Sequence, residues 1–444
     1  MLSSTCTAPC VALDSLMRPA GRGSRSKQSR RAVRGSPQGL RRKVRRHCGR
    51  NRSRLGDSLS RRLSGRRLFF VRKKARRAPL LFHVRRALEL LAFACLPAAL
   101  TALFALGAPA ATAAWDFHAF WGAAANIDRG RSPYADLGAT AAGTPYPLYL
   151  YPPLLAELLT PLGALPFAVA AALWIAASAL ALVAALRLLG VRDWRCYGLA
   201  FTWVPVLHGL RLGTLTPFLV LLVVLGRRGR VVGTILKLFL WPVLALDAAR
   251  RPVRVLAGAA ALTLASWAAV GFAGLTAYPT LLRQTQDAWE RNGYGLPALA
   301  VHAGISPALT GALLLVAALG ALRTILRLDP TPALACAVVL ACLVSPVSWL
   351  HYSTLLLVPV ALYQPRLGWA WALPLVLWLT PFEEADGSLW RVALWLAVMV
   401  ATPVAAWRGT GIVATCIART RRASIPASSP SSGRFSSASS STSA

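Results

Sequence analysis

The sequence predicts an all-α protein that crosses a membrane many times. Of its 444 residues, 56% are hydrophobic and only 15% are charged. Several apolar runs reach the length of about 18–25 residues that a helix needs to cross a bilayer. Trp occurs 15 times, and it concentrates at membrane–water interfaces. We therefore expect about ten transmembrane helices, with short or re-entrant helices and an amphipathic helix in the first external loop.

The N-terminal segment 1–84 is strongly basic. More than half of the 50 Lys and Arg residues lie before residue 87, whereas Asp14 and Asp57 are the acidic residues there. With little apolar periodicity this arm cannot bury a core, so we predict a disordered cytoplasmic arm. It could bind nucleic acid, but next to a first span we expect it to anchor to anionic membrane lipids, without specific nucleic acid. The Ser-rich segment 409–444 is predicted to be a disordered tail.

The first span and first loop come next, opening the domain expected over residues 85–408. Ala87–Ala105 follows two arginines, so the positive-inside rule places its start in the cytoplasm and the following loop outside. Asp116 is well placed to be the N-cap of an amphipathic helix over Phe117–Asp128. Phe120 and Trp121 of that helix would lie in the membrane interface.

An aromatic, Pro-rich stretch then precedes the second span. Tyr149 and Tyr151 alternate with other residues between prolines that exclude a regular helix. They predict a rigid aromatic surface at headgroup depth. Pro166–Leu189 is the second span.

The middle of the chain contains an interruption. Cys196–Leu210 and Leu215–Leu225 predict a hairpin of short helices. Val231–Leu246 is apolar, yet basic clusters flank it on both sides. Because two basic clusters cannot comfortably lie on opposite faces of a membrane, we interpret this piece, which contains Lys237, as re-entrant or broken.

The remaining spans are expected to alternate until both termini are cytoplasmic. Leu256–Ala273 leads to a second external loop, Tyr278–His302. The later apolar segments are Ala308–Leu322, Pro332–Leu343, Leu355–Tyr363, Trp369–Leu379 and Leu389–Trp407.

The ionisable exceptions gather at the external face of this topology. They are Asp116, His118 and His351, with Lys237 in the piece that could reach them. A carboxylate can take a proton from an acceptor hydroxyl, cations can neutralise a departing phosphate, and aromatic rings can stack on a sugar. Each residue also has a structural interpretation: Asp116 as an N-cap, Lys237 as a snorkelling side chain, and His351 as an interfacial hydrogen-bonding residue.

Other chemistries have no motif here. The eight Cys residues are scattered without a C-x-x-C pair, and neither G-x-x-x-x-G-K nor G-x-G-x-x-G occurs. The sequence thus indicates no zinc site, no disulfide framework and no nucleotide site. We predict no cofactor and no metal.

Four stretches resemble glycosyltransferase family 87, which contains actinobacterial polyprenol-phosphate-mannose-dependent mannosyltransferases. They are W-D-F-H-A-F-W-G-A-A-A-N-I-D-R-G-R-S-P-Y, Y-L-Y-P-P, I-L-K-L-F-L-W-P-V-L-A-L and S-P-V-S-W-L-H-Y. The resemblance runs from about residue 85 to 405. It implies a GT-C fold with an extracytoplasmic active site in the cell membrane, a polyprenyl-phosphate sugar donor, a lipid or glycan acceptor, and inversion at the anomeric carbon. It also implies that neither a nucleotide nor an obligatory metal is needed.

The resemblance assigns roles position by position. It implies that Asp116 is the catalytic base and that Lys237 and His351 bind the donor. The further substrate-binding candidates are His118, Tyr149, Tyr151 and Asn292. The chain departs from the family at Thr214, Thr216 and Tyr352, which leaves the donor-phosphate contacts and the acceptor open. The alternatives are a lipid-linked-sugar flippase or small-molecule transporter, and a non-catalytic membrane partner.

Overall fold

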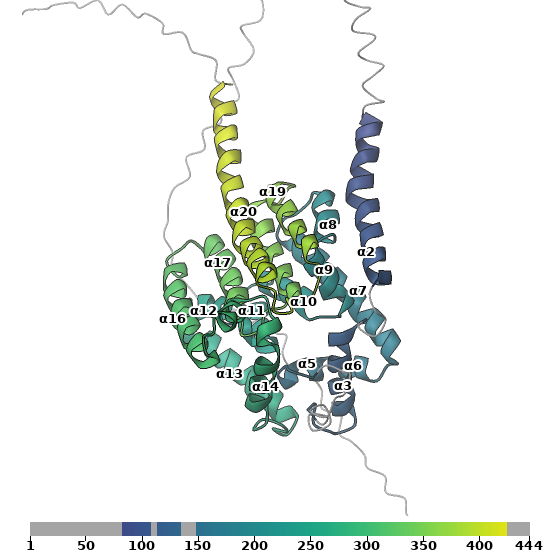
Figure 1. The fold of residues 1–444 in the computed structure, drawn as a ribbon, viewed down its shortest axis with the longest axis vertical. Coiled ribbons are helices and arrows are strands. Elements are labelled where there is room, and N and C mark those ends of the chain that lie inside the picture. Colours follow the sequence, from purple (N-terminus) through teal and green to yellow (C-terminus); the bar gives the residue numbers. More distant parts are fainter. Residues whose placement is uncertain (1–81, 108–112, 135–147, 424–444) are drawn as a thin grey trace, which may run out of the picture. The chain divides into compact units, whose positions relative to one another are not determined.

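Helices account for all the regular structure in the described part of the chain. The computed structural model describes residues 82–107, 113–134 and 148–423, with side chains to residue 409. No strand occurs among these residues (Figure 1), which confirms the all-α prediction. The predicted arm lies outside the described residues up to 81, and the predicted tail lies outside them from 424. Between these limits the backbone of α20 continues to Ala423, beyond the predicted boundary at 408.

The elements follow one another with short connections. In chain order they are η1 (Leu91–Cys95), α2 (Leu96–Gly107), α3 (Trp115–Asp128), α5 (Pro153–Leu158), α6 (Thr160–Gly163), α7 (Phe167–Leu188), α8 (Trp194–Ala200), α9 (Val204–Arg211), α10 (Thr216–Val224), α11 (Arg227–Leu236), η3 (Leu238–Leu240), α12 (Trp241–Arg250), α13 (Pro252–Ala269), α14 (Tyr278–Trp289), η4 (Glu290–Asn292), α15 (Leu296–His302), α16 (Pro307–Ile325), α17 (Pro330–Leu343), η5 (Leu350–Leu356), α18 (Leu357–Tyr363), α19 (Trp369–Ala372), η6 (Leu373–Leu379) and α20 (Leu389–Ala423).

Five helices in the described residues are long and apolar enough to cross a membrane. They are Phe82–Phe104, Phe167–Leu188, Pro252–Ala269, Pro307–Ile325 and Leu389–Gly409. A sixth span is possible if α9 and α10, bent by 112° to each other, count as one broken span. The chain is therefore a multi-pass membrane protein, and the predicted hairpin between Cys196 and Leu225 is present.

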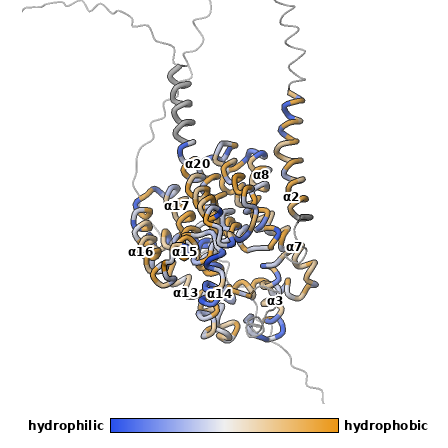
Figure 2. Tube along the Cα trace, viewed as in Figure 1, coloured by the Kyte–Doolittle hydropathy of each residue, from blue (hydrophilic) through white to orange (hydrophobic). Residues whose placement is uncertain are grey.

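The long helices expose apolar side chains where a soluble protein would have polar ones. Leu88, Leu91 and Leu103 of the first helix are exposed. Leu256 and Leu264 of α13 are exposed as well. The hydrophobic colour of α2 and the blue segments near α14 show the same division (Figure 2). Such surfaces are costly in water but fit contact with lipid chains.

Some apolar runs that the sequence predicted as spans are instead internal elements. Every residue from Leu350 to Ala361 is buried, and η5 and α18 in this region are each seven residues long. Trp369–Leu379 is likewise divided between α19 and η6. A run that is apolar because protein surrounds it has the same composition as one that faces lipid.

The apolar piece Val231–Leu246 is broken, as predicted. Lys237 has an extended backbone (φ −148°, ψ 101°) between α11 and η3. The basic residue nearest this break on α11, Arg230, forms a bidentate ion pair with Asp247 of α12, at 2.7 and 2.9 Å. That pair closes α11 and α12 into a hairpin and leaves Lys237 at its bend.

Sequence-distant elements meet around the bend between α9 and α10. The short segment η5 packs against both of these helices, and α17 packs against η3 and α12. Helices α3, α5 and α6 lie side by side (Figure 1). This packing brings the first turn of α3, the break at Lys237 and the start of η5 to the same region.

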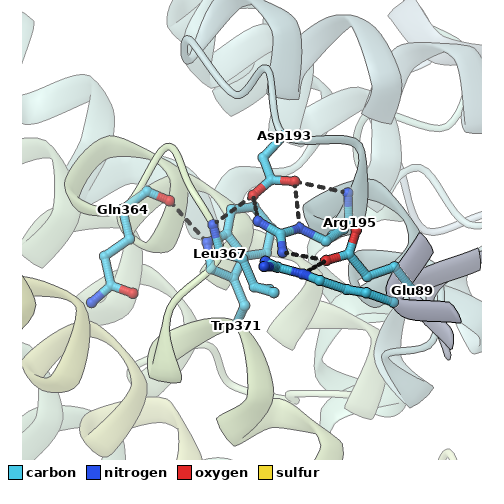
Figure 3. A network of polar contacts seen from close by, with 7 residues as sticks. Glu89, Asp193, Arg195, Gln364, Leu367 and Trp371 are labelled. Carbon is cyan, nitrogen blue, oxygen red and sulfur yellow. Dashed lines mark hydrogen bonds and ion pairs between the residues drawn. The ribbon is translucent and has the colours of Figure 1, made fainter. Parts of the chain in front are cut away.

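A separate polar network connects the first helix to two later loops (Figure 3). Arg195 forms a bidentate hydrogen-bonded pair with Asp193, at 3.0 and 2.9 Å, and lies 3.6 Å from Glu89. The Leu367 amide donates to Asp193, and the Trp371 indole donates to the Gln364 carbonyl. This network contains none of the predicted site residues.

Candidate active site

The first turn of α3 is fastened to the end of α9 through its backbone. The Ala114 amide donates to the Arg211 carbonyl at 2.8 Å, and the Asp116 amide donates to the Leu212 carbonyl at 2.9 Å. Gly213 continues this turn with φ +66°, and a Cβ there would lie 2.7 Å from Cβ of Phe117. A residue with a side chain would be both strained and too large at that position. The backbone of Asp116 is thus held in place by the turn between α9 and α10.

Asp116 does not cap α3, contrary to the sequence expectation. The N-cap is Ala114, in a left-handed conformation (φ 54°), with no side-chain capping bond. Asp116 lies inside the first turn, and its backbone contacts release its carboxylate for other interactions. Phe120 was expected at the membrane interface but is 1% exposed, while the Trp121 indole donates to the Leu165 carbonyl. The apolar face of α3 therefore packs against protein.

Lys237 lies among aromatic rings at the break after α11. Its Nζ is 4.2 Å from the ring centroid of Tyr352, 5.5 Å from that of Tyr151 and 5.8 Å from that of Phe239. The ion pairs of the described residues do not include Lys237. Burial lowers its pKa to about 8, although Asp116 and Glu383 partly oppose that shift. An ammonium group held by rings rather than by a carboxylate keeps its charge available for an anion.

His351 is held by Glu383, a residue that the sequence analysis did not single out. Its Nδ1 makes a short hydrogen bond to Oε1 of Glu383, and its backbone amide donates to the same oxygen at 3.4 Å. His351 is 2% exposed, and its Nε2 has no partner in the described part of the chain. Across the carboxylate, Nδ1 of His208 lies 3.3 Å from Oε2. Glu383 thus bridges two imidazoles.

The charges of Asp116, Lys237 and His351 act on one another. Burial raises the pKa of Asp116, His351 and then Lys237 lower it, and Glu383 raises it slightly. The residue is partly exposed, so a carboxyl with a raised pKa remains accessible to a reactant. Raising the pKa of a carboxylate makes it a stronger base, whereas the two neighbours keep it ionised. The structure therefore brings together the three residues that the sequence analysis placed at the centre of the site.

Tyr151 belongs to this cluster, and Tyr149 does not. The ring of Tyr151 faces Lys237 and lies edge-on to Phe120, with centroids 4.9 Å apart. The Tyr149 hydroxyl instead donates to the Pro152 carbonyl at 2.7 Å and accepts from the Ala156 amide at 3.0 Å. Tyr149 is buried, and it fixes the start of α5. The structure thus gives the two tyrosines different surroundings.

His118 and Asn292 lie outside the charged cluster. The imidazole of His118 packs against Phe167 and Trp121, with centroids 4.9 and 5.9 Å away, and burial lowers its pKa. The carbonyl of Asn292 accepts from the Ala385 amide at 2.8 Å. Together with the Tyr294 hydroxyl, which donates to the Phe382 carbonyl, this contact holds the turn that carries Glu383.

The positions that depart from the family pattern are buried near the site. The Thr216 amide donates to Oγ1 of Thr214 at 3.3 Å, and both residues are fully buried. They shape the turn on which α3 rests. Tyr352 stacks on Phe239, with centroids 4.7 Å apart, and its ring is the one closest to Lys237. The departure at Tyr352 thus supplies one wall of the lysine site.

The larger hollows and metal-type clusters of the described residues do not offer another site. A hollow of about 330 Å³ between the first helix and α19 is apolar, and its lining is Phe93, Leu199, Leu367, Gly368, Trp369 and Ala372. No group of three or more His, Cys, Asp and Glu side chains is arranged to hold a metal within the described residues. The Asp116–Lys237–His351 cluster is the candidate active site.

The fold and the cluster together define a membrane-embedded enzyme, and the comparison with known families gives its class. Residues 149–346 match the sequence model of glycosyltransferase family 87. This part of the chain belongs to that family, and the protein is a membrane glycosyltransferase. Lys237 lies within the matched residues, and Asp116 and His351 flank them. No curated protein and no solved structure is significantly similar to the chain.

Proposed function

We propose that this protein transfers a sugar, mannose in the first instance, from a polyprenyl-phosphate donor to a lipid or glycan acceptor. Transfer takes place at the extracytoplasmic face of the cell membrane, in a GT-C-like fold with both termini in the cytoplasm. The observation that supports this most is the meeting of Asp116, Lys237 and His351 from three distant parts of the chain. A donor anchored by a polyprenyl chain would reach such a site from the surrounding lipid.

In the proposed reaction, Asp116 takes the proton from the acceptor hydroxyl. The hydroxyl oxygen then attacks the anomeric carbon from the face opposite the phosphate, so the configuration inverts. Lys237 and His351 stabilise the lipid phosphate as it leaves with the electron pair of the broken bond. The ring of Tyr151 can pack against the sugar or the isoprenoid chain.

The distribution of charge favours an enzyme over a flippase or a small-molecule transporter. A transporter is expected to have polar groups along a path through the middle of its spans. In the candidate spans, the charged residues lie near the ends, as with Arg187 in α7, Arg254 in α13 and Arg323 in α16. The buried charges of the described residues gather instead at the Asp116 cluster.

The test is Asp116→Asn, with Asp128→Asn as the matched control. Asp128 ends the same helix and is exposed, so its substitution changes the formal charge equally without reaching the site. We expect Asp116→Asn to reduce transfer by about 10²–10⁴-fold, while expression and membrane insertion remain normal. Membrane fractions supplied with radiolabelled polyprenyl-phosphate mannose provide the assay. Retained turnover in Asp116→Asn contradicts the assignment of the base.

A further inference from the structure

The carboxylate of Glu383 occupies an unusual position between two buried histidines. His351 and His208 contact its two oxygens from opposite sides, and these residues come from η5 and α9. Their relative exposures are 2% and 5%. A turn that appears in the sequence only as an acidic run, Glu383-Glu384-Ala-Asp386, thus sends one of its carboxylates inward.

The hydrogen-bond partners fix most of the protons in this group. Nε2 of His208 lies 3.0 Å from the Pro381 carbonyl, which can only accept, so Nε2 carries a proton. The contact of His208 Nδ1 with Oε2 then contains one proton, on either the ring or the acid. Oε1 accepts from the His351 amide, so Nδ1 of His351 carries the proton that it shares with Oε1.

This arrangement leaves Nε2 of His351 as a lone-pair acceptor. It is on the side of the ring away from Glu383, it is buried, and it has no partner in the described part of the chain. An unpartnered ring nitrogen in such a position is costly unless it has a function. Since His351 has the largest charge effect on Asp116 of any neighbour, the proton that Asp116 takes up has His351 within its reach.

We propose that Glu383 is a positioning residue that fixes the His351 imidazole with its proton on Nδ1, so that Nε2 can receive the proton that Asp116 removes from the acceptor. This inference rests on the proposed function and deepens it. His208 supports Glu383 from the other side. The unit works as a proton relay behind the base and is itself not in contact with the sugar.

The relay balances as follows. The acceptor O–H bond breaks, its oxygen forms the new bond to the anomeric carbon, and the bond from that carbon to the phosphate oxygen breaks with its electrons on the phosphate. The proton passes from the Asp116 carboxyl to Nε2 of His351. The ring becomes an imidazolium paired with Glu383, and this adds a positive charge next to the departing phosphate.

The electrostatics of Glu383 are compatible with this role. Burial raises its pKa to about 7, and His208 is first among the groups that oppose the rise. The other charged or titratable groups acting with or on it are His351, Lys237, Arg211, Glu384, Tyr294 and Tyr352. A carboxyl with a pKa near neutrality exchanges protons with imidazole at little cost in either direction.

The first experiment measures the histidine tautomer and requires no enzymatic activity. The protein contains six His residues, so ¹⁵N-histidine labelling in lipid bilayers gives few signals, and His351→Asn identifies the signal of His351. We expect protonated Nδ1 and unprotonated Nε2 in the wild type. Glu383→Gln should redistribute this tautomer, and Glu384→Gln, on the neighbouring residue, should not. A wild-type His351 with its proton on Nε2, or a tautomer unaffected by Glu383→Gln, overturns the proposal.

The second experiment measures transfer from radiolabelled polyprenyl-phosphate mannose. We expect Glu383→Gln to lower kcat about 100-fold or more, with the donor KM nearly unchanged, Glu384→Gln to behave as wild type, and Glu383→Asp to restore part of the rate. A rise in KM at constant kcat, or a Glu383→Gln variant as active as wild type, overturns the relay. If Asp116→Asn retains turnover while the tautomer is as expected, the proposed base fails instead, so the two failures are distinguishable.

Discussion

Two polar networks in this protein use the same residue types in opposite ways. In the Glu89–Asp193–Arg195 network, acids and guanidinium pair directly (Figure 3). The hydrogen-bonded guanidinium of Arg195 lowers the pKa of Asp193. In the cluster of Asp116 and Lys237, burial instead raises the pKa of the acid and lowers that of the amine. Each group there is shifted toward the pH range in which it can give or take a proton.

The difference lies in how completely the partners are satisfied. Both oxygens of Asp193 accept from Arg195, and the Leu367 amide adds a further bond. Nothing in that network is left for a ligand, so it serves to connect segments of the chain. Lys237, by contrast, is held by aromatic rings. A satisfied network stabilises a fold, whereas an incompletely satisfied one is suited to binding and catalysis.

The largest effect that separates the two networks is expected from Lys237→Met. Methionine has a similar length and remains compatible with the rings of Tyr151 and Tyr352, but it carries no charge to stabilise the leaving phosphate. We expect transfer to fall about 10²–10³-fold, with expression unchanged. The matched control is Arg228→Met, an exposed position on α11, which should retain wild-type rates. An active Lys237→Met protein would show that this buried cation serves the fold alone.

The next effect is the dependence of transfer on pH. Lys237 is charged below its pKa of about 8, so the rate should decline as the pH rises through that value, by up to about tenfold per unit. Asp116 must be ionised to act as base, and its raised pKa moves the acidic limb upward from that of an ordinary aspartate. Lys237→Arg should move the alkaline limb to higher pH, because a guanidinium stays charged. An alkaline limb that does not respond to Lys237→Arg would assign it to another group.

The sequence predicted the three central residues because each breaks a local pattern. Asp116 and Lys237 are charges in apolar surroundings, and His351 stands in an apolar run that is now seen to be buried. Glu383 had no such signal. It is the first of three acids in one turn, and the run resembles a solvated surface turn. Its burial depends on His351, 32 residues away, and on His208, much further away in the chain. Only the tertiary fold distinguishes it from Glu384.

The all-helical class was predictable from composition, but the number of spans was not. Leu350–Tyr363 and Trp369–Leu379 are apolar, yet they are shorter elements with 3₁₀ segments. Hydropathy measures the polarity of a run and does not distinguish protein from lipid as the surrounding medium. The break at Lys237 was predictable, because the basic residues on both sides of Val231–Leu246 conflict with a simple crossing.

The smallest effect on transfer is expected in the satisfied network, where Asp193→Ala should affect stability rather than chemistry. The substitution removes the bidentate pair with Arg195, the cap on the Arg195 amide and the bond to Leu367. Because Asp193 is largely buried, we expect a loss of about 1–3 kcal/mol in the free energy of unfolding, measured in mixed micelles. Arg85→Gln breaks only an exposed pair with Glu89 and should cost about 0.2–0.5 kcal/mol. The transfer rate per folded molecule should stay at the wild-type value in both variants, and a loss of rate without a loss of stability in Asp193→Ala would remove the distinction between the two networks.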